Sequence, residues 1–138
     1  MKNNSLRVVV DTNVLVSALV FGGVPRKVME ILIEEATVVT SPEILTELRR
    51  IVHAKFPAFL EDLQRLEQLL KRDGVQVVLG DTHVTASRDP DDNKVIETAI
   101  AGACSYIISG DKDLLDLKQY EDIQIVTPAN FLEIIQKG

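Results

Sequence analysis

Cysteine, aromatic residues and long apolar runs are scarce in this sequence of 138 residues, and each scarcity excludes a class of protein. A single cysteine, Cys104, forms no intramolecular disulfide, and with only two histidines it cannot complete a tetrahedral zinc site. Tryptophan is absent and only four Phe and two Tyr are present, so no aromatic platform for stacking bases is evident. No apolar run is long enough to span a membrane and the N-terminus lacks a signal-peptide pattern, so we expect a cytoplasmic protein.

Positive charge is also in deficit, because 15 Lys and Arg are set against 21 Asp and Glu, a net charge of −6. A basic protein that binds nucleic acid by neutralising phosphates is therefore disfavoured. An enzyme that reaches phosphates through metal ions remains compatible with this balance. The length is that of one domain, so we expect a single domain over residues 1–138.

Short apolar strands alternate with helices along the chain. Strands are expected at residues 6–10, 37–40, 75–79, 106–108 and 123–126. Helices are expected at residues 13–20, 26–36, 42–54, 58–72, 90–102 and 128–136, the third with Ser41 as its N-cap. Near-continuous apolar strands separated by helices predict an α/β fold with a parallel sheet covered on both faces.

Functional sites of such sheets lie beyond the carboxyl ends of the strands, and two acids follow strands directly. Asp11 comes after the first strand, and Asp111 follows the fourth strand after Ser109 and Gly110. Each has a structural alternative: Asp11 suits the N-cap of the next helix, and Asp111 suits a turn after Gly110. Neither acid, taken alone, distinguishes a functional role from a structural one.

Helical geometry singles out two further acids. Glu47 lies on the shoulder of the apolar stripe of its helix, beside Ile51, where it can lean over the sheet edge or face solvent. Asp92 projects near the centre of the apolar stripe that follows Pro90, whereas Asp91 projects sideways. A carboxylate on the side facing the sheet must be capping, paired or bound to a cation.

Four acids from separate segments, Asp11, Glu47, Asp92 and Asp111, can therefore meet at one edge of the sheet. Carboxylates packed together repel one another unless cations intervene. Ligand sets made only of oxygen select hard ions such as Mg²⁺ or Mn²⁺. The pattern thus favours metal-assisted attack of water on a phosphodiester.

Four segments carry a family resemblance: VVVDTNVLVSAL, SPEILTELRRIV, DPDDNKVIETAIAGACSYIISGDKDLL and VTPANFLEII. Together they resemble the PIN-domain family, and more closely the PIN-family toxins of prokaryotic toxin–antitoxin pairs (VapC-like). The resemblance runs from Val8 to about Ile135. It implies a metal-dependent ribonuclease with a three-layer α/β/α fold and a five-stranded parallel sheet in the order 3-2-1-4-5. That order places the first and fourth strands side by side, which brings Asp11 and Asp111 together.

The resemblance also implies roles for individual residues. The acids assigned to catalysis and to binding one or two Mg²⁺ or Mn²⁺ ions are Asp11, Glu47, Asp92 and Asp111. The residues assigned to orienting water or these carboxylates are Thr12, Asn13, Ser109 and Asp113. Asp89 suits a cap or turn before Pro90. The acids that neighbour Asp92 could nevertheless take the role assigned to Asp92. The implied partners are an RNA substrate, a cognate antitoxin that covers the site, and a second copy in a homodimer.

Other protein classes also place acids after the first strand of a parallel sheet. A haloacid-dehalogenase-type phosphatase requires a second acid two residues after Asp11, where Asn13 stands, and a receiver domain requires an acidic pair there. A degenerate PIN module that only binds RNA or protein is the alternative within the family. The basic residues that could line an RNA path, or simply be solvated, are Arg26, Arg49, Arg50, Lys55, Arg88 and Lys112.

Overall fold

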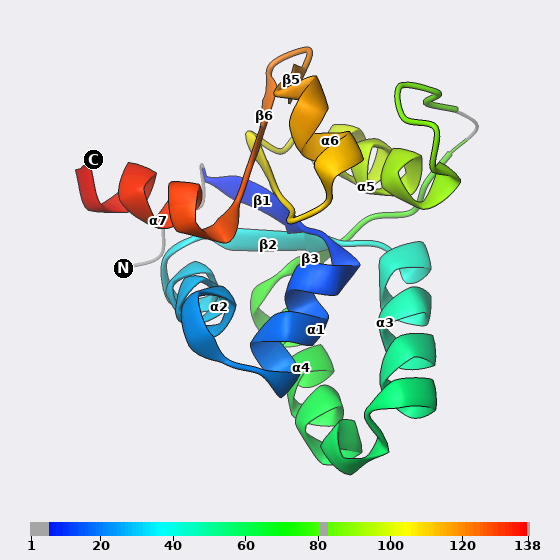
Figure 1. The fold of residues 1–138 in the computed structure, drawn as a ribbon, viewed down its shortest axis with the longest axis vertical. Helices are drawn as coiled ribbons and strands as arrows, with labels where there is room; N and C mark the ends of the chain where they lie inside the picture. Colours follow the sequence, from blue (N-terminus) through cyan, green and yellow to red (C-terminus); the bar gives the residue numbers. More distant parts are fainter. Residues whose placement is uncertain (1–5, 81–82, 138) are drawn as a thin grey trace.

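The structure, a computed structural model, describes residues 6–80 and 83–137 (Figure 1). The strands are β1 (Arg7–Val10), β2 (Thr37–Thr40), β3 (Val75–Gln76), β4 (Tyr106–Ile108), β5 (Gln119–Tyr120) and β6 (Ile123–Val126). The helices are α1 (Thr12–Val20), α2 (Gly23–Glu35), α3 (Pro42–Lys55), α4 (Leu60–Asp73), α5 (Pro90–Ala101), α6 (Lys112–Leu117) and α7 (Pro128–Lys137), with a short 3-10 turn at Pro57–Phe59. Among the described residues, no helix is both long and apolar enough to cross a membrane.

The sheet confirms the α/β fold and the strand order expected from the sequence. Its order is β3-β2-β1-β4-β6-β5, and β6 is the fifth strand of the expected 3-2-1-4-5 arrangement. All pairs are parallel except β5 with β6. The expected number of five strands is therefore wrong by one, because a short antiparallel strand, β5, is added at the edge of the sheet. Positive φ angles at Lys118 (64°) and Glu121 (52°) reverse the chain tightly enough for this pairing.

Two other boundaries differ from the sequence-based expectation. The third strand ends at Gln76 rather than 79, because β2 stops at Thr40 and the Val77 N–H donates to the last available carbonyl, that of Thr40, at 2.8 Å. Helix α6 was not expected from the sequence. It begins where the Asp111 carboxylate accepts a hydrogen bond from the Asp113 N–H, and it buries Leu114 completely.

Helices cover both faces of the sheet. Val8 and Val9 point to opposite faces of β1 because side chains alternate along a strand, and both are fully buried. In Figure 1, α1 to α4 lie below the sheet and α5 and α6 lie above it. A Cβ at Gly102 would lie 2.5 Å from Val39 Cγ1, so the close approach of the end of α5 to β2 requires glycine.

The carboxyl edge of the sheet gathers the starts of the helices that carry the candidate acids. Asp11 follows β1 and precedes α1, and its N–H donates to the Ile108 carbonyl of β4 at 2.9 Å. Ser41 caps α3, as the sequence predicts, by accepting a hydrogen bond from the Ile44 N–H at 3.4 Å. The Ser41 hydroxyl also bonds Thr98 at 2.8 Å, which ties the start of α3 to the C-terminal half of α5.

Candidate metal and active site

Asp11 and Asp111 follow adjacent strands, β1 and β4, and are linked through Ser109. The buried Ser109 hydroxyl donates to Asp11 Oδ2 at 2.8 Å and accepts from the Asp111 N–H at 2.9 Å. Asp11 occupies the N-cap position of α1, but its side chain makes no capping hydrogen bond. Asp111 does cap its helix, α6. The capping alternative given for Asp11 therefore does not account for its buried carboxylate. Asp111, for which a turn was the alternative, has a structural role as the cap of α6.

The Asp11 carboxylate lies in an environment that disfavours its charge. Burial raises its pKa most, the Ser109 hydrogen bond opposes that rise, and the negative charges of Asp111 and Asp89 add to it. Only 6% of Asp11 is exposed. A cation beside this carboxylate would offset both the cost of burying its charge and the repulsion by neighbouring acids.

Asp92 faces the sheet edge and Asp91 faces outward, which is the difference that the helical wheel predicts. Asp92 is 4% exposed, whereas Asp91 is exposed to solvent. The Ser87 hydroxyl donates to Asp92 Oδ2 at 3.0 Å. The pKa of Asp92 is raised to about 6, chiefly by burial, against the Ser87 hydrogen bond and with the added repulsion of nearby acids, Asp111 first among them.

Asp89 joins the acid cluster in addition to capping α5. Its Oδ1 accepts from the Asp91 N–H at 2.9 Å, which is the cap that the sequence suggests. One carboxylate oxygen from each of Asp89, Asp92 and Asp111 also lies within 4.8 Å of the other two. The sequence-based site contained no Asp89, because its capping role already accounted for an acid at that position. The available signal was the run Asp89-Pro90-Asp91-Asp92.

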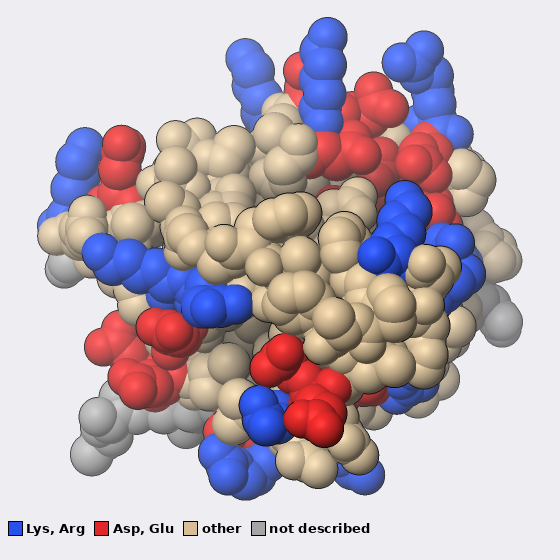
Figure 2. All heavy atoms as spheres, turned by 60° about the horizontal axis from the view of Figure 1, so that its bottom comes forward, with Lys and Arg blue, Asp and Glu red and all other residues tan. Residues whose placement is uncertain are grey.

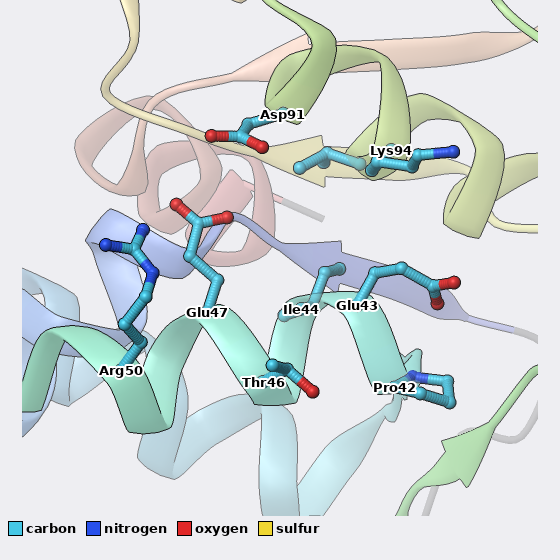
Figure 3. A pocket seen from close by; sticks show the side chains of 9 residues that line it. Pro42, Glu43, Ile44, Thr46, Glu47, Arg50, Asp91 and Lys94 are labelled. Atoms are coloured by element: carbon cyan, nitrogen blue, oxygen red, sulfur yellow. The ribbon is translucent and has the colours of Figure 1, made fainter.

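Glu47 lies across a groove from Asp91. Its half-buried carboxylate extends from α3 toward Asp91 at the start of α5 (Figure 3). Burial raises the Glu47 pKa most, followed by the negative charges of Asp91 and Asp11. The groove has a volume of about 430 Å³, and Arg50 and Lys94 are among its lining residues. Glu47 is therefore near Asp11 but outside the cluster of Asp89, Asp92 and Asp111.

The comparisons with known proteins agree with this geometry. Residues 7–113, which include all of these acids, match the PIN domain. The chain belongs to the PIN-domain family. An uncharacterised protein of Methanocaldococcus jannaschii is 33% identical over 150 residues, covering 99% of this chain and 96% of the relative. The family assignment made from the sequence motifs is therefore confirmed.

A solved structure shares the PIN fold of this chain. It is that of VapBC2 from Rickettsia felis bound to a DNA fragment from their promoter. The TM-score is 0.60 at 14% identity, and the match covers 87% of this chain and 97% of the other. At this identity the likeness concerns the fold, and it agrees with the α/β arrangement described above.

The residues expected to support the acids of this PIN domain differ in how they are placed. Thr12 is buried, and its hydroxyl has no hydrogen-bond partner among the described residues. Asn13 is exposed and makes no hydrogen bond to an acid in the described part of the chain. The Asp113 N–H donates to Asp111, while its carboxylate forms an ion pair with Arg88 at 3.5 Å. Ser109 is the expected supporting residue that contacts an acid of the site directly through its side chain.

The donor set of this PIN domain fits a hard divalent cation. The clustered donors are carboxylate oxygens alone, and they lie within 4.8 Å of one another. Two oxygens on one Mg²⁺ lie at most about 4.2 Å apart, so a small adjustment brings these donors onto one ion. Within the described residues, no Lys or Arg forms an ion pair with Asp11, Asp89, Asp92 or Asp111. A cation from solution could therefore offset the negative charge of these acids.

Two of the basic residues that the sequence suggests for an RNA path or a solvated surface, Arg26 and Arg49, make contacts within the protein. Arg26 donates from Nε and Nη2 to the carbonyls of Ala18 and Leu19, both at 2.9 Å, and so closes the end of α1. Arg49 bonds Glu67. Lys and Arg are interspersed with Asp and Glu on the face shown in Figure 2. Phosphate recognition by a continuous basic surface is therefore not favoured on this face.

His53 and Cys104 are ordinary residues of the fold. His53 is exposed on α3. Cys104 is buried, and burial raises its pKa to about 12, so the thiol stays protonated and unreactive at neutral pH.

Proposed function

We propose that this PIN domain is a Mg²⁺- or Mn²⁺-dependent endoribonuclease that hydrolyses RNA phosphodiester bonds. The observation that supports this most is the set of three carboxylate oxygens within 4.8 Å of one another, from Asp89, Asp92 and Asp111. Asp11 is buried beside them and repelled by two of them. Family membership adds to this, because PIN domains are generally nucleases.

The residues of the chain have separate tasks in this proposal. Asp92 and Asp111 hold the ion, together with Asp89, and Asp11 contributes charge next to it. A bound Mg²⁺ or Mn²⁺ would activate water and offset the charge of the phosphate oxygens. Glu47 lies across the groove from the start of α5, so we assign it to holding a water molecule or a second ion on that side. Ser109 keeps the Asp11 carboxylate oriented by its hydrogen bond.

We also propose that the protein is the toxin of a toxin–antitoxin pair. The support is the VapC-like resemblance of its motifs and the fold shared with VapBC2 from Rickettsia felis. This proposal includes a cognate antitoxin that covers the acidic site and a homodimer of the toxin. It predicts that expression without the antitoxin arrests growth, and that the Asp92→Asn variant does not.

The deciding experiment measures cleavage of single-stranded RNA by the purified protein with Mn²⁺, with Mg²⁺ and with excess EDTA. We expect cleavage with either ion, none in EDTA, and recovery when Mn²⁺ is restored. Asp122→Asn, an exposed acid in the β5–β6 turn, is the matched control and should cleave like the parent. Full cleavage in EDTA would refute the mechanism, and RNA binding without cleavage would leave a PIN module that only binds.

A further inference from the structure

The loop before α5 is tied to that helix by two buried side chains. Asn93 accepts from the Ser87 N–H at 2.8 Å and donates from Nδ2 to the Ser87 carbonyl at 2.9 Å. One turn further along α5, Glu97 Oε2 accepts from the Val84 N–H at 3.2 Å. Both peptide groups of Ser87 are therefore fixed by one side chain, and the loop leading to Asp89 is held along α5.

From this position the Ser87 hydroxyl contacts two acids of the cluster. It accepts from the Asp89 N–H at 3.3 Å and donates to Asp92 Oδ2 at 3.0 Å. A hydroxyl that accepts one bond and donates another has a defined direction for its proton. Ser87, which precedes α5, thus links the Asp89 backbone to the Asp92 carboxylate through its hydroxyl.

A second serine makes the same pair of bonds at the other side of the site. Ser109 accepts from the N–H of Asp111, two residues on, and donates to Asp11 Oδ2. Ser87 likewise accepts from the N–H two residues on and donates to a buried aspartate. The repetition on two unrelated segments indicates that the serine donor serves the buried acid as well as the local turn.

Each acid of the cluster has one oxygen engaged by the protein. Asp92 Oδ2 accepts from Ser87, Asp89 Oδ1 from the Asp91 N–H, and Asp111 Oδ1 from the Asp113 N–H. Among the described residues, no hydrogen bond is made to the second oxygen of any of the three. Each carboxylate can therefore offer one oxygen to an ion. Mg²⁺ favours six ligands in octahedral geometry, whereas Ca²⁺ commonly takes both oxygens of a carboxylate.

We infer that Ser87, held by Asn93, is a positioning residue that leaves a single Asp92 oxygen for the cation and so favours a small six-coordinate ion over Ca²⁺. The inference rests on the proposed metal site. The competing explanation is that the Ser87 hydroxyl only shapes the turn through Asp89. Removal of the hydroxyl would then alter stability without altering the preference between ions.

The test measures ion binding without RNA, by the electron paramagnetic resonance signal of free Mn²⁺ and by displacement of Mn²⁺ with Ca²⁺. Ser87→Ala should weaken Mn²⁺ binding by about tenfold, as loss of a group that orients a ligand does. It should weaken Ca²⁺ binding less, because Asp92 Oδ2 becomes free, so the Mn²⁺/Ca²⁺ affinity ratio falls. Ser87→Thr keeps the hydroxyl and should restore most of both values. Ser105→Ala, which changes an exposed serine just before β4, is the matched control.

Asn93 is tested by a double-mutant cycle. Asn93→Ala should weaken Mn²⁺ binding in the wild-type background and have little further effect when combined with Ser87→Ala, because it acts through Ser87. Equal effects in both backgrounds would refute that role. If Ser87→Ala does not fold, Ser87→Cys carries the comparison, since a thiol donates only weakly.

The positioning role of Ser87 is overturned if Ser87→Ala binds Mn²⁺ and Ca²⁺ with the wild-type ratio, or if the wild-type protein binds no Mn²⁺. A protein that binds Mn²⁺ with the expected Ser87 dependence but cleaves no RNA refutes the proposed nuclease alone. The two proposals therefore fail in distinguishable ways.

Discussion

Ser109 donates a hydrogen bond of 2.8 Å to Asp11 across adjacent strands, although the two residues are 98 positions apart in the chain. The bond forms because β1 and β4 pair in parallel and end at the same edge. Ser109 is fully buried, so its hydroxyl has no access to solvent. The Asp11 carboxylate is thus oriented by a residue at the end of the neighbouring strand.

Replacement of Asp11 with asparagine should separate charge from structure. Asp11→Asn keeps the shape and an acceptor for Ser109 and removes a buried charge, so in EDTA the variant should be at least as stable toward urea as the parent. RNA cleavage should fall by about a hundredfold or more, equivalent to about 2.7 kcal/mol of activation free energy. Asp122→Asn serves as the control. A variant that is less stable but fully active would show that Asp11 has only a structural role.

Asp91 and Asp92 should differ sharply although they are neighbours. Asp92→Asn should reduce cleavage at saturating Mn²⁺ by about a hundredfold or more, because it replaces a buried acid of the cluster. Asp91→Asn should leave turnover nearly intact and cost at most about 1 kcal/mol of stability through the helix N-terminus. Both variants are assayed on one RNA. An inactive Asp91→Asn beside an active Asp92→Asn would refute the assignment of Asp92.

Asp89 allows its cap and ligand roles to be measured separately. Asparagine caps helices about as well as aspartate, so Asp89→Asn should unfold at nearly the wild-type temperature in EDTA. If Asp89 also binds the ion, the Mn²⁺ dissociation constant should rise by about tenfold. Calorimetric titration with Mn²⁺ measures this dissociation constant. Unchanged Mn²⁺ affinity would limit Asp89 to capping α5.

The stability of the metal-free protein should decrease as pH rises through the range set by Asp92. Its folded-state pKa of about 6 lies above the ordinary 3.8, so the folded protein binds the proton more tightly than the unfolded chain does. The contribution of Asp92 to the free energy of unfolding is fully present below about pH 4 and is lost by about pH 6 to 7. The raised pKa values of Asp11 and Glu47 act in the same direction. Urea unfolding in EDTA at several pH values measures the trend.

Asp92→Asn is the control for this pH dependence, because it removes the titrating group. The decrease in stability between pH 4 and pH 7 should be smaller in this variant than in the parent. Saturating Mn²⁺ should reverse the trend in the parent, since the ion binds the ionised acids of the folded state. An equal decrease in both proteins without metal would assign it to other groups.

The main layout of the site was predictable because it depends on regular periodicities. An apolar strand followed by an acid places Asp11 and Asp111 at one sheet edge, and the 3.6-residue helical repeat separates Asp92 from Asp91. Both depend only on the identity and spacing of residues within one element. The structure places these residues as that reasoning expects.

The features that were missed depend on loop paths and on unusual backbone angles. Ser87 reaches Asp92 only because Asn93 binds the peptide groups of Ser87, six positions away, and no periodicity indicates such a contact. Strand β5 requires positive φ at Lys118 and Glu121, although neither is a residue type that favours it. These features become visible only when the path of the chain is known.

Both outer strands of the sheet, β3 and β5, are two residues long. A neighbouring chain that adds to a sheet needs a row of unpaired backbone N–H and C=O groups, and an edge this short provides few of them. Strand-to-strand association between copies is therefore disfavoured at either side. We therefore expect a partner to bind the helices and loops, where surface substitutions can change the choice of partner and leave the sheet untouched.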